Sequence, residues 1–268
     1  MKPAGSSKLA FAVDGAQIIA RVFSVLRLIS YRSPRGVRLT DLADAADLPR
    51  PTVHRILRAM IVERIVRQDP ATKRYQLGSF AFELGLAAPQ QTRLLERCRP
   101  ILRKLANETE DTVYLVKRSA IDAVCIDRVE GSFPIRTFTL AVGDRRPLGI
   151  GAAGLALLST LSDEDIDAVV QRNAREYRFY NGLTPQEVME SVARVRALGY
   201  AMNIEKTTHG VSGIGLSIPN KSGPPFVGVS IAAITERITG ERVGELHAAA
   251  RRAADELAAL LGTDEDWD

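Results

Sequence analysis

Asp47-Leu48-Pro49-Arg50-Pro51-Thr52-Val53-His54-Arg55-Ile56-Leu57 is the stretch that decides the fold of the first part of the chain. Its prolines turn the chain and start a helix, because proline is well tolerated only in the first turn of a helix. Apolar residues recur at helical spacing as far as residue 61, so one face of this helix is buried. The opposite face is polar and cationic, which suits a helix that enters the major groove of DNA. That face carries Arg50, Thr52, His54, Arg55 and Arg58.

The flanking residues complete a small domain. Upstream, apolar residues at helical spacing predict an amphipathic helix over residues 14–30, and Thr40 is the predicted N-cap of a short second helix. Downstream, residues 65–68 and 74–77 flank a five-residue turn and predict a β-hairpin. This order of elements is that of a winged helix-turn-helix, with Lys73 and Arg74 in the wing. The sequence therefore predicts a DNA-binding domain over residues 12–78.

Charge is distributed unevenly between the two parts of the chain. Residues 1–78 hold 14 Lys and Arg against 6 Asp and Glu, a net charge of +8, whereas residues 79–268 have a net charge of −4. A basic module beside a mildly acidic one indicates that the first module meets a polyanion. Basic residues that serve only solubility would give the same count, so charge alone leaves both explanations open.

Composition also limits the class of protein. No apolar stretch approaches the roughly 20 residues that cross a bilayer, and the first 30 residues lack the pattern of a secretion signal. The two cysteines, Cys98 and Cys125, give neither a disulfide framework nor a four-ligand zinc pattern. We therefore expect a cytoplasmic protein with no membrane partner.

The second part of the chain predicts a mixed α/β (α+β) domain. After a linker helix over residues 79–92, a domain over residues 93–264 is expected to hold a six-stranded sheet with flanking helices. The six runs that resemble strands are residues 112–117, 123–129, 134–140, 200–204, 213–218 and 226–234. Helices are expected at residues 94–108, 152–159, 163–173, 185–198 and 241–261.

Several motifs together closely resemble the IclR family of bacterial transcriptional regulators. In the first half these are Leu39-Thr40-Asp41-Leu42-Ala43, the stretch quoted above and Tyr75-Gln76-Leu77-Gly78. In the second half the most specific is Val142-Gly143-Asp144-Arg145-Arg146-Pro147-Leu148. The resemblance implies a GAF-like effector-binding and oligomerisation domain, a homodimer or homotetramer, and a pseudo-palindromic double-stranded DNA operator.

The same resemblance implies which residues contact DNA. They are Arg50, Thr52 and Arg55 on the recognition helix, with His54 on the same face, and Lys73 and Arg74 in the wing. Arg55 has a structural alternative, which is to pair with an acidic neighbour such as Asp41. Whether the regulator represses or activates is not encoded in these residues.

Gly149-Ile150-Gly151-Ala152-Ala153-Gly154 matches the dinucleotide-binding pattern G-x-G-x-x-G. That site needs a preceding strand and an acid about 20 residues later, ending the next strand. Here the acids of residues 163–167 open a helix, which argues against it. Two interpretations remain: glycines that allow close helix packing, and a helix N-terminus that binds a carboxylate. The second matches the place where family members bind small acidic effectors, here Gly151, Ala152 and Ala153.

Other candidate effector contacts come from comparison with the family's pocket. They are Cys125, Arg146, Asn203, Glu205, Gly213 and Ser230. Arg136 and Arg146 could each pair with a carboxylate, and each could equally be a surface cation or join an internal ion pair. Cys125 alternates within a strand and could be a packed core thiol. Lys206 stands where an acid is common and Ala232 lacks a hydroxyl found in some relatives. These departures predict a roomier, more apolar cavity and an aromatic or medium-sized organic acid as effector.

The sequence offers no evident catalytic set, metal site or cofactor site. Ser212 lies in a segment that breaks G-x-S-x-G at its last position, and the histidines, His54, His209 and His247, have no acid in an evident relay. One rival hypothesis is a small-molecule enzyme whose N-terminal module only dimerises. Another is a DNA-binding protein whose second half serves only assembly. In that case no small acid would raise its melting temperature.

Overall fold

The computed structural model describes residues 16–31, 36–87, 89–220 and 223–261. The chain divides into two compact units, Met1–Pro89 and Gln90–Asp268, so the division falls within the expected linker. The expected domain limits at residues 12 and 264 lie outside the described residues. No helix in the described ranges is long and apolar enough to cross a membrane.

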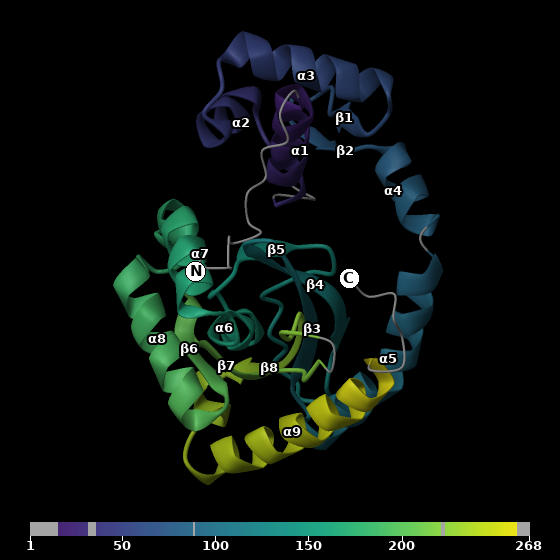
Figure 1. Ribbon diagram of the computed structural model, residues 1–268. Helices are drawn as coiled ribbons and strands as arrows, with labels where there is room; N and C mark the ends of the chain where they lie inside the picture. Colours follow the sequence, from purple (N-terminus) through teal and green to yellow (C-terminus); the bar gives the residue numbers. More distant parts are fainter. Residues whose placement is uncertain (1–15, 32–35, 88, 221–222, 262–268) are drawn as a thin grey trace, which may run out of the picture. The chain divides into compact units, whose positions relative to one another are not determined.

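The first unit is a winged helix-turn-helix, as predicted (Figure 1). Its elements are α1 (Gln17–Ser30), α2 (Leu39–Ala46), α3 (Arg50–Val62), β1 (Val66–Gln68), β2 (Tyr75–Leu77) and α4 (Ser79–Leu86). Helices α1, α2 and α3 and the hairpin of β1 and β2 enclose one apolar core, in which Ile29, Leu42 and Leu57 are fully buried. Asp47 ends α2 with φ +52°, and this left-handed conformation turns the chain toward α3.

The predicted N-cap at Thr40 is wrong. Helix α2 begins at Leu39, and the Thr40 hydroxyl bonds to the carboxylate of Asp41 at 3.3 Å instead of capping a backbone N–H. The reason lies just upstream, where Val37 and Tyr75 exchange two backbone hydrogen bonds of 2.9 and 2.8 Å. This bridge fixes the point from which the helix starts.

The second unit contains one six-stranded sheet in the order β5-β4-β3-β8-β7-β6, and every neighbouring pair is antiparallel. The curled sheet wraps around α6 (Figure 1). Its strands are β3 (Thr112–Ser119), β4 (Asp122–Val129), β5 (Arg145–Pro147), β6 (Ala201–Thr208), β7 (Val211–Ser217) and β8 (Val227–Ile234). Its helices are α5 (Pro89–Thr109), α6 (Ala152–Ser159), α7 (Asp163–Tyr177), α8 (Pro185–Leu198) and α9 (Glu241–Leu261), with a 3₁₀ turn at Thr235–Arg237.

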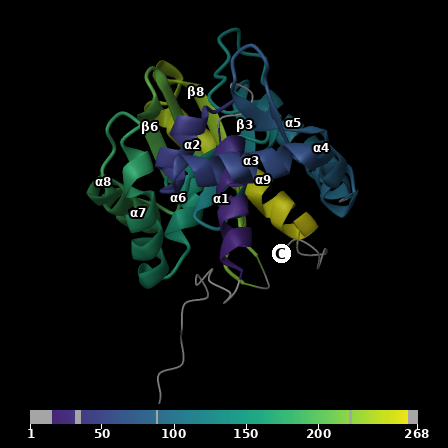
Figure 2. The same ribbon diagram turned by 90° about the horizontal axis from the view of Figure 1, so that it is seen from above.

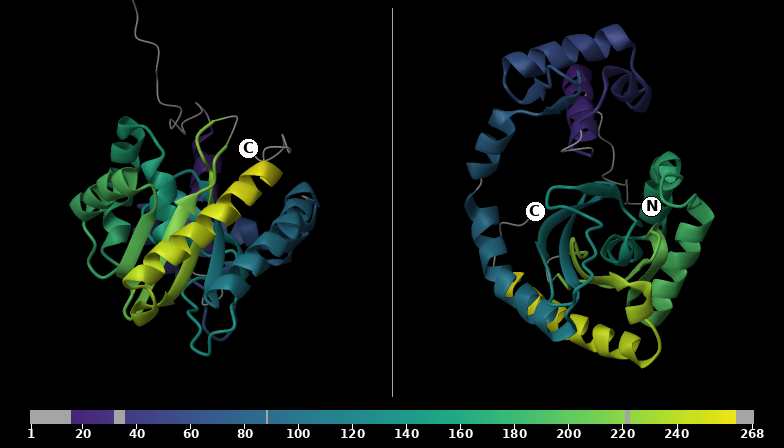
Figure 3. Two further views of the ribbon diagram at one scale, coloured as in Figure 1. Left: turned by 90° about the horizontal axis from the view of Figure 1, so that it is seen from below. Right: turned by 180° about the vertical axis from the view of Figure 1, so that it is seen from behind.

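Alternation along the central strands gives the sheet two different faces. One face is aliphatic and packs against α5 and α9, which lie side by side (Figure 3). Lys104–Glu256 and Glu108–Arg252 ion pairs link these two helices. The opposite face of the sheet packs against α6. Helices α7 and α8 cover the side of the unit near β6 (Figure 2). On that face β7 and β8 present mostly small residues: Gly213, Gly215, Gly228, Ser230 and Ala232.

These small residues allow α6 to lie directly on the sheet. A Cβ on Gly215 would come within 2.4 Å of the Ala152 carbonyl carbon, and one on Gly228 within 3.2 Å of the Ala153 carbonyl oxygen. All eight residues of α6 are buried. The sheet therefore fixes the N-terminus of α6 at a defined position.

One predicted strand is wrong. Residues 134–140 form no strand, and the sixth strand is instead β5, which pairs with β4. Residues 134–140 lie across the face of the sheet, where Thr137 bonds to Ala232 of β8 and to the hydroxyl of Tyr114 of β3. A segment that crosses strands in this way cannot join their hydrogen-bond ladder.

Candidate DNA-contacting surface and ligand cavity

Helix α3 presents its cationic face to solvent. Arg50, His54 and Arg55 are exposed and Thr52 is half-buried, whereas Val53, Ile56 and Leu57 are buried beneath them. No ion pair between Arg55 and Asp41 occurs in the described part of the chain. The guanidinium of Arg55 is thus available to a partner.

The wing turn is held by its own acid. Asp69 Oδ1 accepts the backbone N–H groups of Ala71 and Thr72 at 3.0 and 2.7 Å, and the bonds from Thr72 hold the pKa of Asp69 below its usual value. Lys73 is exposed at the end of this turn, while Arg74 is half-buried and donates to the carbonyl of Gly36 at 3.0 Å. The turn thus presents the Lys73 ammonium to solvent, and Arg74 anchors the wing.

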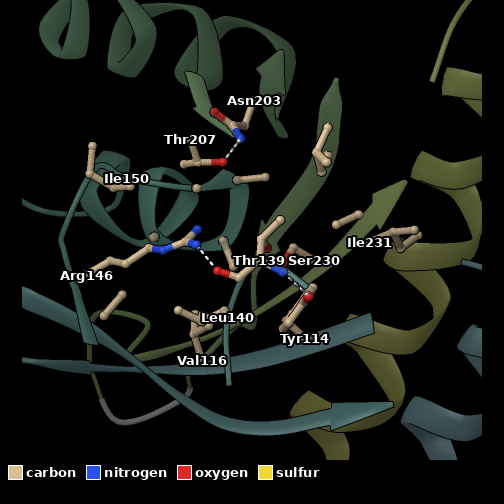
Figure 4. A pocket seen from close by; sticks show the side chains of 18 of the residues that line it. Tyr114, Val116, Thr139, Leu140, Arg146, Ile150, Asn203, Thr207, Ser230 and Ile231 are labelled. Atoms are coloured by element: carbon tan, nitrogen blue, oxygen red, sulfur yellow. Dashed lines mark hydrogen bonds between the residues drawn. The ribbon is translucent and has the colours of Figure 1, made fainter. Parts of the chain in front are cut away.

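The second unit contains a cavity between the N-terminus of α6 and the small-residue face of the sheet (Figure 4). Its volume is about 50 Å³. The apolar part of its wall includes Val116, Leu140 and Ile150, and the polar part includes Tyr114, Thr139, Asn203, Thr207 and Ser230. Arg146 is the only charged residue among those described that line it.

Arg146 reaches the cavity from β5, at one edge of the sheet. Burial lowers the pKa of its guanidinium, and it donates a hydrogen bond to the carbonyl of Thr139. Among the described residues no carboxylate forms an ion pair with it. A half-buried guanidinium that lacks an anion has lost part of its hydration without compensation, so this arrangement favours an anionic ligand.

The N-terminus of α6 lies beside the same guanidinium. A Cβ on Gly151 would lie 3.8 Å from Arg146 Nη1. Gly151 is the N-cap and has φ +74°, and Gly151, Ala152 and Ala153 all line the cavity. The first N–H groups of a helix have no partner within the helix and carry the positive end of its dipole. Helix and arginine can therefore stabilise one carboxylate together.

The opposite edge strand, β6, supplies the facing polar wall. The amide of Asn203 donates to the hydroxyl of Thr207 at 3.0 Å, across an irregularity in the pairing of β6 with β7 (Figure 4). Ser230, on β8, is 8% exposed and also lines the cavity. These groups are neutral, so only the Arg146 side of the cavity carries charge.

The structure brings together seven of the nine candidate effector residues: Arg146, Gly151, Ala152, Ala153, Asn203, Gly213 and Ser230. Cys125 and Glu205 do not line the cavity. Cys125 is 1% exposed, and burial raises the pKa of its thiol to about 12. The Glu205 carboxylate binds His209 at 2.9 Å, and the hydroxyl of Thr235 and the N–H of Gly210 lower its pKa. Arg136 is exposed and pairs with Glu130 at 2.9 Å.

Sequence reasoning missed Tyr114, Thr139 and Thr207. Tyr114 could have been found from strand alternation, because it faces the same side of the sheet as Val116 and pairs directly with Ser230. Thr139 and Thr207 lie in an irregular segment and a bulge, where no periodic signal exists. No cluster of three or more His, Cys, Asp or Glu suited to a metal occurs in the described ranges.

Comparisons with known proteins agree along nearly the whole chain. The family described as "Bacterial transcriptional regulator IclR C-terminal" matches residues 86–259, and the "IclR helix-turn-helix domain" matches residues 19–70. The acetate operon repressor of Salmonella typhimurium is 31% identical over 97% of this chain and 95% of its own. The transcriptional repressor IclR of Escherichia coli is 31% identical over 94% and 92%. A crystal structure of a transcriptional regulator from Alicyclobacillus acidocaldarius, 25% identical, superimposes with a TM-score of 0.70 over 93% of this chain and 99% of its own.

Proposed function

Because the chain belongs to the IclR family of bacterial transcriptional regulators, we propose that an organic acid bound in its cavity controls how the helix-turn-helix domain binds an operator. The observation that carries this proposal is Arg146, a half-buried guanidinium with no anionic partner among the described residues, beside the N-terminus of α6. The carboxylate would lie between these two groups. The apolar side chains of Val116, Leu140 and Ile150 then face the body of the ligand.

The apolar side chains of the wall, Val116, Leu140 and Ile150, favour an aromatic or medium-sized acid. A two- or three-carbon acid held at Arg146 would leave much of the apolar wall in contact with water. Calorimetry with benzoate, pyruvate and glyoxylate tests this directly. Benzoate is expected to bind most tightly, and tighter binding of pyruvate or glyoxylate would exclude the aromatic class.

We propose that α3 and the wing contact DNA in different ways. Arginines that read guanine edges contribute about 1–3 kcal/mol of discrimination each, whereas phosphate contacts contribute affinity but no sequence information. For Lys73→Ala, affinity should fall equally on operator and random DNA, and the slope of log affinity against log salt should fall by about 1. For Arg50→Ala and Arg55→Ala, a loss confined to the operator would identify base reading. A uniform loss would identify phosphate binding instead.

Apolar residues on α1 and α4 support a homodimer, or a tetramer built from two such dimers, whose subunits contact each other through the first unit. Seven large hydrophobic side chains on these helices are exposed: Ile18, Ile19, Phe23, Phe80, Phe82, Leu84 and Leu86. Exposed apolar surface of this extent marks protein contacts. Phe82→Asp should shift sedimentation toward the monomer, whereas Phe179→Asp, at a site with a similar exposed fraction (70% against 69%), should not. Equal effects of the two substitutions would contradict this interface.

The footprint on DNA upstream of the chain's own and neighbouring genes tests the whole proposal. A protected palindrome that an acid releases or remodels is the expected result. Since the two most similar regulators named above are repressors, we propose that this protein also represses. The alternative, a small-molecule enzyme with an N-terminal dimerisation module, predicts no protection at low salt, where phosphate contacts are strongest.

A further inference from the structure

Residues 134–140, here called the cover segment, lie over the cavity without joining the sheet. Thr139 and Leu140 form part of the cavity wall. On the other side, Ile135 and Phe138 are more than half exposed. The segment therefore forms part of the cavity wall, and the hydrogen bonds described for its backbone come from side chains.

Two cavity-lining side chains hold the cover segment from within. The hydroxyl of Tyr114 donates to the carbonyl of Thr137 at 2.5 Å and accepts the N–H of Thr139 at 3.2 Å. Arg146 donates to the carbonyl of Thr139 (Figure 4). Further bonds join Thr137 to Ala232 at 3.0 Å and Arg128 to Leu140 at 3.4 Å.

Arg146 thus has two competing uses. The guanidinium of Arg146 donates to the neutral carbonyl of Thr139. A carboxylate in the cavity would form charge-assisted bonds with the same guanidinium, and such bonds are roughly twice as strong as neutral ones. A carboxylate that binds bidentately, through Nη1 beside the N-terminus of α6 and through Nη2, is therefore expected to take Nη2 from the Thr139 carbonyl.

We propose that the cover segment is the ligand-responsive part of the second unit and that Tyr114 is the positioning residue that opposes its release. This inference rests on the proposed function and adds a direction to it. Binding of the acid moves Arg146 from the Thr139 carbonyl to the carboxylate and loosens the segment. Because coupling between two equilibria is reciprocal, a change that loosens the segment and leaves the contacts to the acid intact must strengthen binding of the acid.

Tyr114→Phe tests this reciprocity, because it removes the hydroxyl that bonds to the segment and keeps the ring in the cavity wall. Loss of both hydrogen bonds from the closed segment corresponds to roughly thirtyfold tighter binding of benzoate. A purely structural role for Tyr114 predicts weaker binding instead. Tyr177→Phe is the matched control, since its hydroxyl bonds to the Leu148 carbonyl at 2.7 Å, away from the segment. It should leave benzoate affinity within about twofold.

Calorimetry and hydrogen exchange together separate the outcomes. Benzoate should raise amide exchange in the cover segment of the parent protein, and Tyr114→Phe should show raised exchange before benzoate is added. Binding of benzoate without tighter binding to Tyr114→Phe, or with added protection of the segment, would overturn the inference and leave the proposed function intact. Failure of every tested acid to bind the parent protein would overturn the proposed function, and the inference with it.

Discussion

Gly215→Ala should destabilise the second unit, although it adds only one methyl group. The new Cβ would lie 2.4 Å from the Ala152 carbonyl carbon and 2.5 Å from the Ala153 nitrogen, where ordinary contacts begin at 3.4 Å. The N-terminus of α6 must therefore move by about 1 Å, the difference between 3.4 and 2.4 Å. Overpacking of this kind typically costs about 1–3 kcal/mol. Because the same helix end contributes to the proposed carboxylate site, benzoate affinity should fall as well.

Gly244→Ala provides the matched control for this prediction. Gly244 lies in α9, and a Cβ there meets no atom within 4 Å. Alanine at an open helical position usually stabilises by about 0.5–1 kcal/mol. Urea denaturation followed by circular dichroism should therefore give changes of opposite sign for the two substitutions. If both substitutions changed the free energy of unfolding equally, or both stabilised the protein, Gly215 would not be needed for the close packing of α6 on the sheet.

Three further predictions concern single side chains. Arg146→Met should abolish the rise in melting temperature that benzoate gives, and a retained benzoate response in thermal scans would contradict this. The free energy of unfolding without benzoate should change by less than about 1 kcal/mol, because a half-buried charge is removed along with its hydrogen bond. Burial and Arg251 lower the pKa of His247 from 6.5, so the unfolded chain binds more protons and stability should fall as pH drops from about 7 through the lowered pKa. His247→Phe, which preserves stacking on Tyr200, should reduce this dependence in denaturation curves measured at several pH values, and an unchanged slope would count against it. Since burial raises the pKa of Cys125 to about 12, iodoacetamide at roughly pH 8 should modify it only after unfolding, and mass spectrometry of the native protein would reveal any earlier reaction.

Helices α1, α2 and α3 of the first unit could be predicted because each buries apolar residues at helical spacing. In α3 the buried residues Val53, Ile56, Leu57 and Met60 follow helical spacing. The start of α2 could not be predicted in the same way. A tertiary bridge between Val37 and Tyr75 sets it, and local capping preference at Thr40 carries no information about that bridge.

The cavity was only partly predictable, because it joins opposite edges of a curled sheet. Arg146 comes from β5 and Asn203 from β6, which lie at the two ends of the strand order. Chemical type and family resemblance identified both residues as candidates, but they did not predict that the two residues line the same cavity. Residues 134–140 have the apolar and β-branched composition of a strand, yet Tyr114 and Arg146 hold them across the sheet. Local pattern cannot distinguish a segment in a ladder from one that crosses it.

The small-residue face of β7 and β8 limits how a regulator of this shape can change its ligand. Gly215 and Gly228 touch the backbone of α6, so larger side chains there would displace the helix before they altered the cavity. Ser230 and Ala232 lie on the same face and open into the cavity itself. New ligand preferences can therefore arise by substitution at a few positions along β8, while their neighbours two residues away stay fixed by the fold.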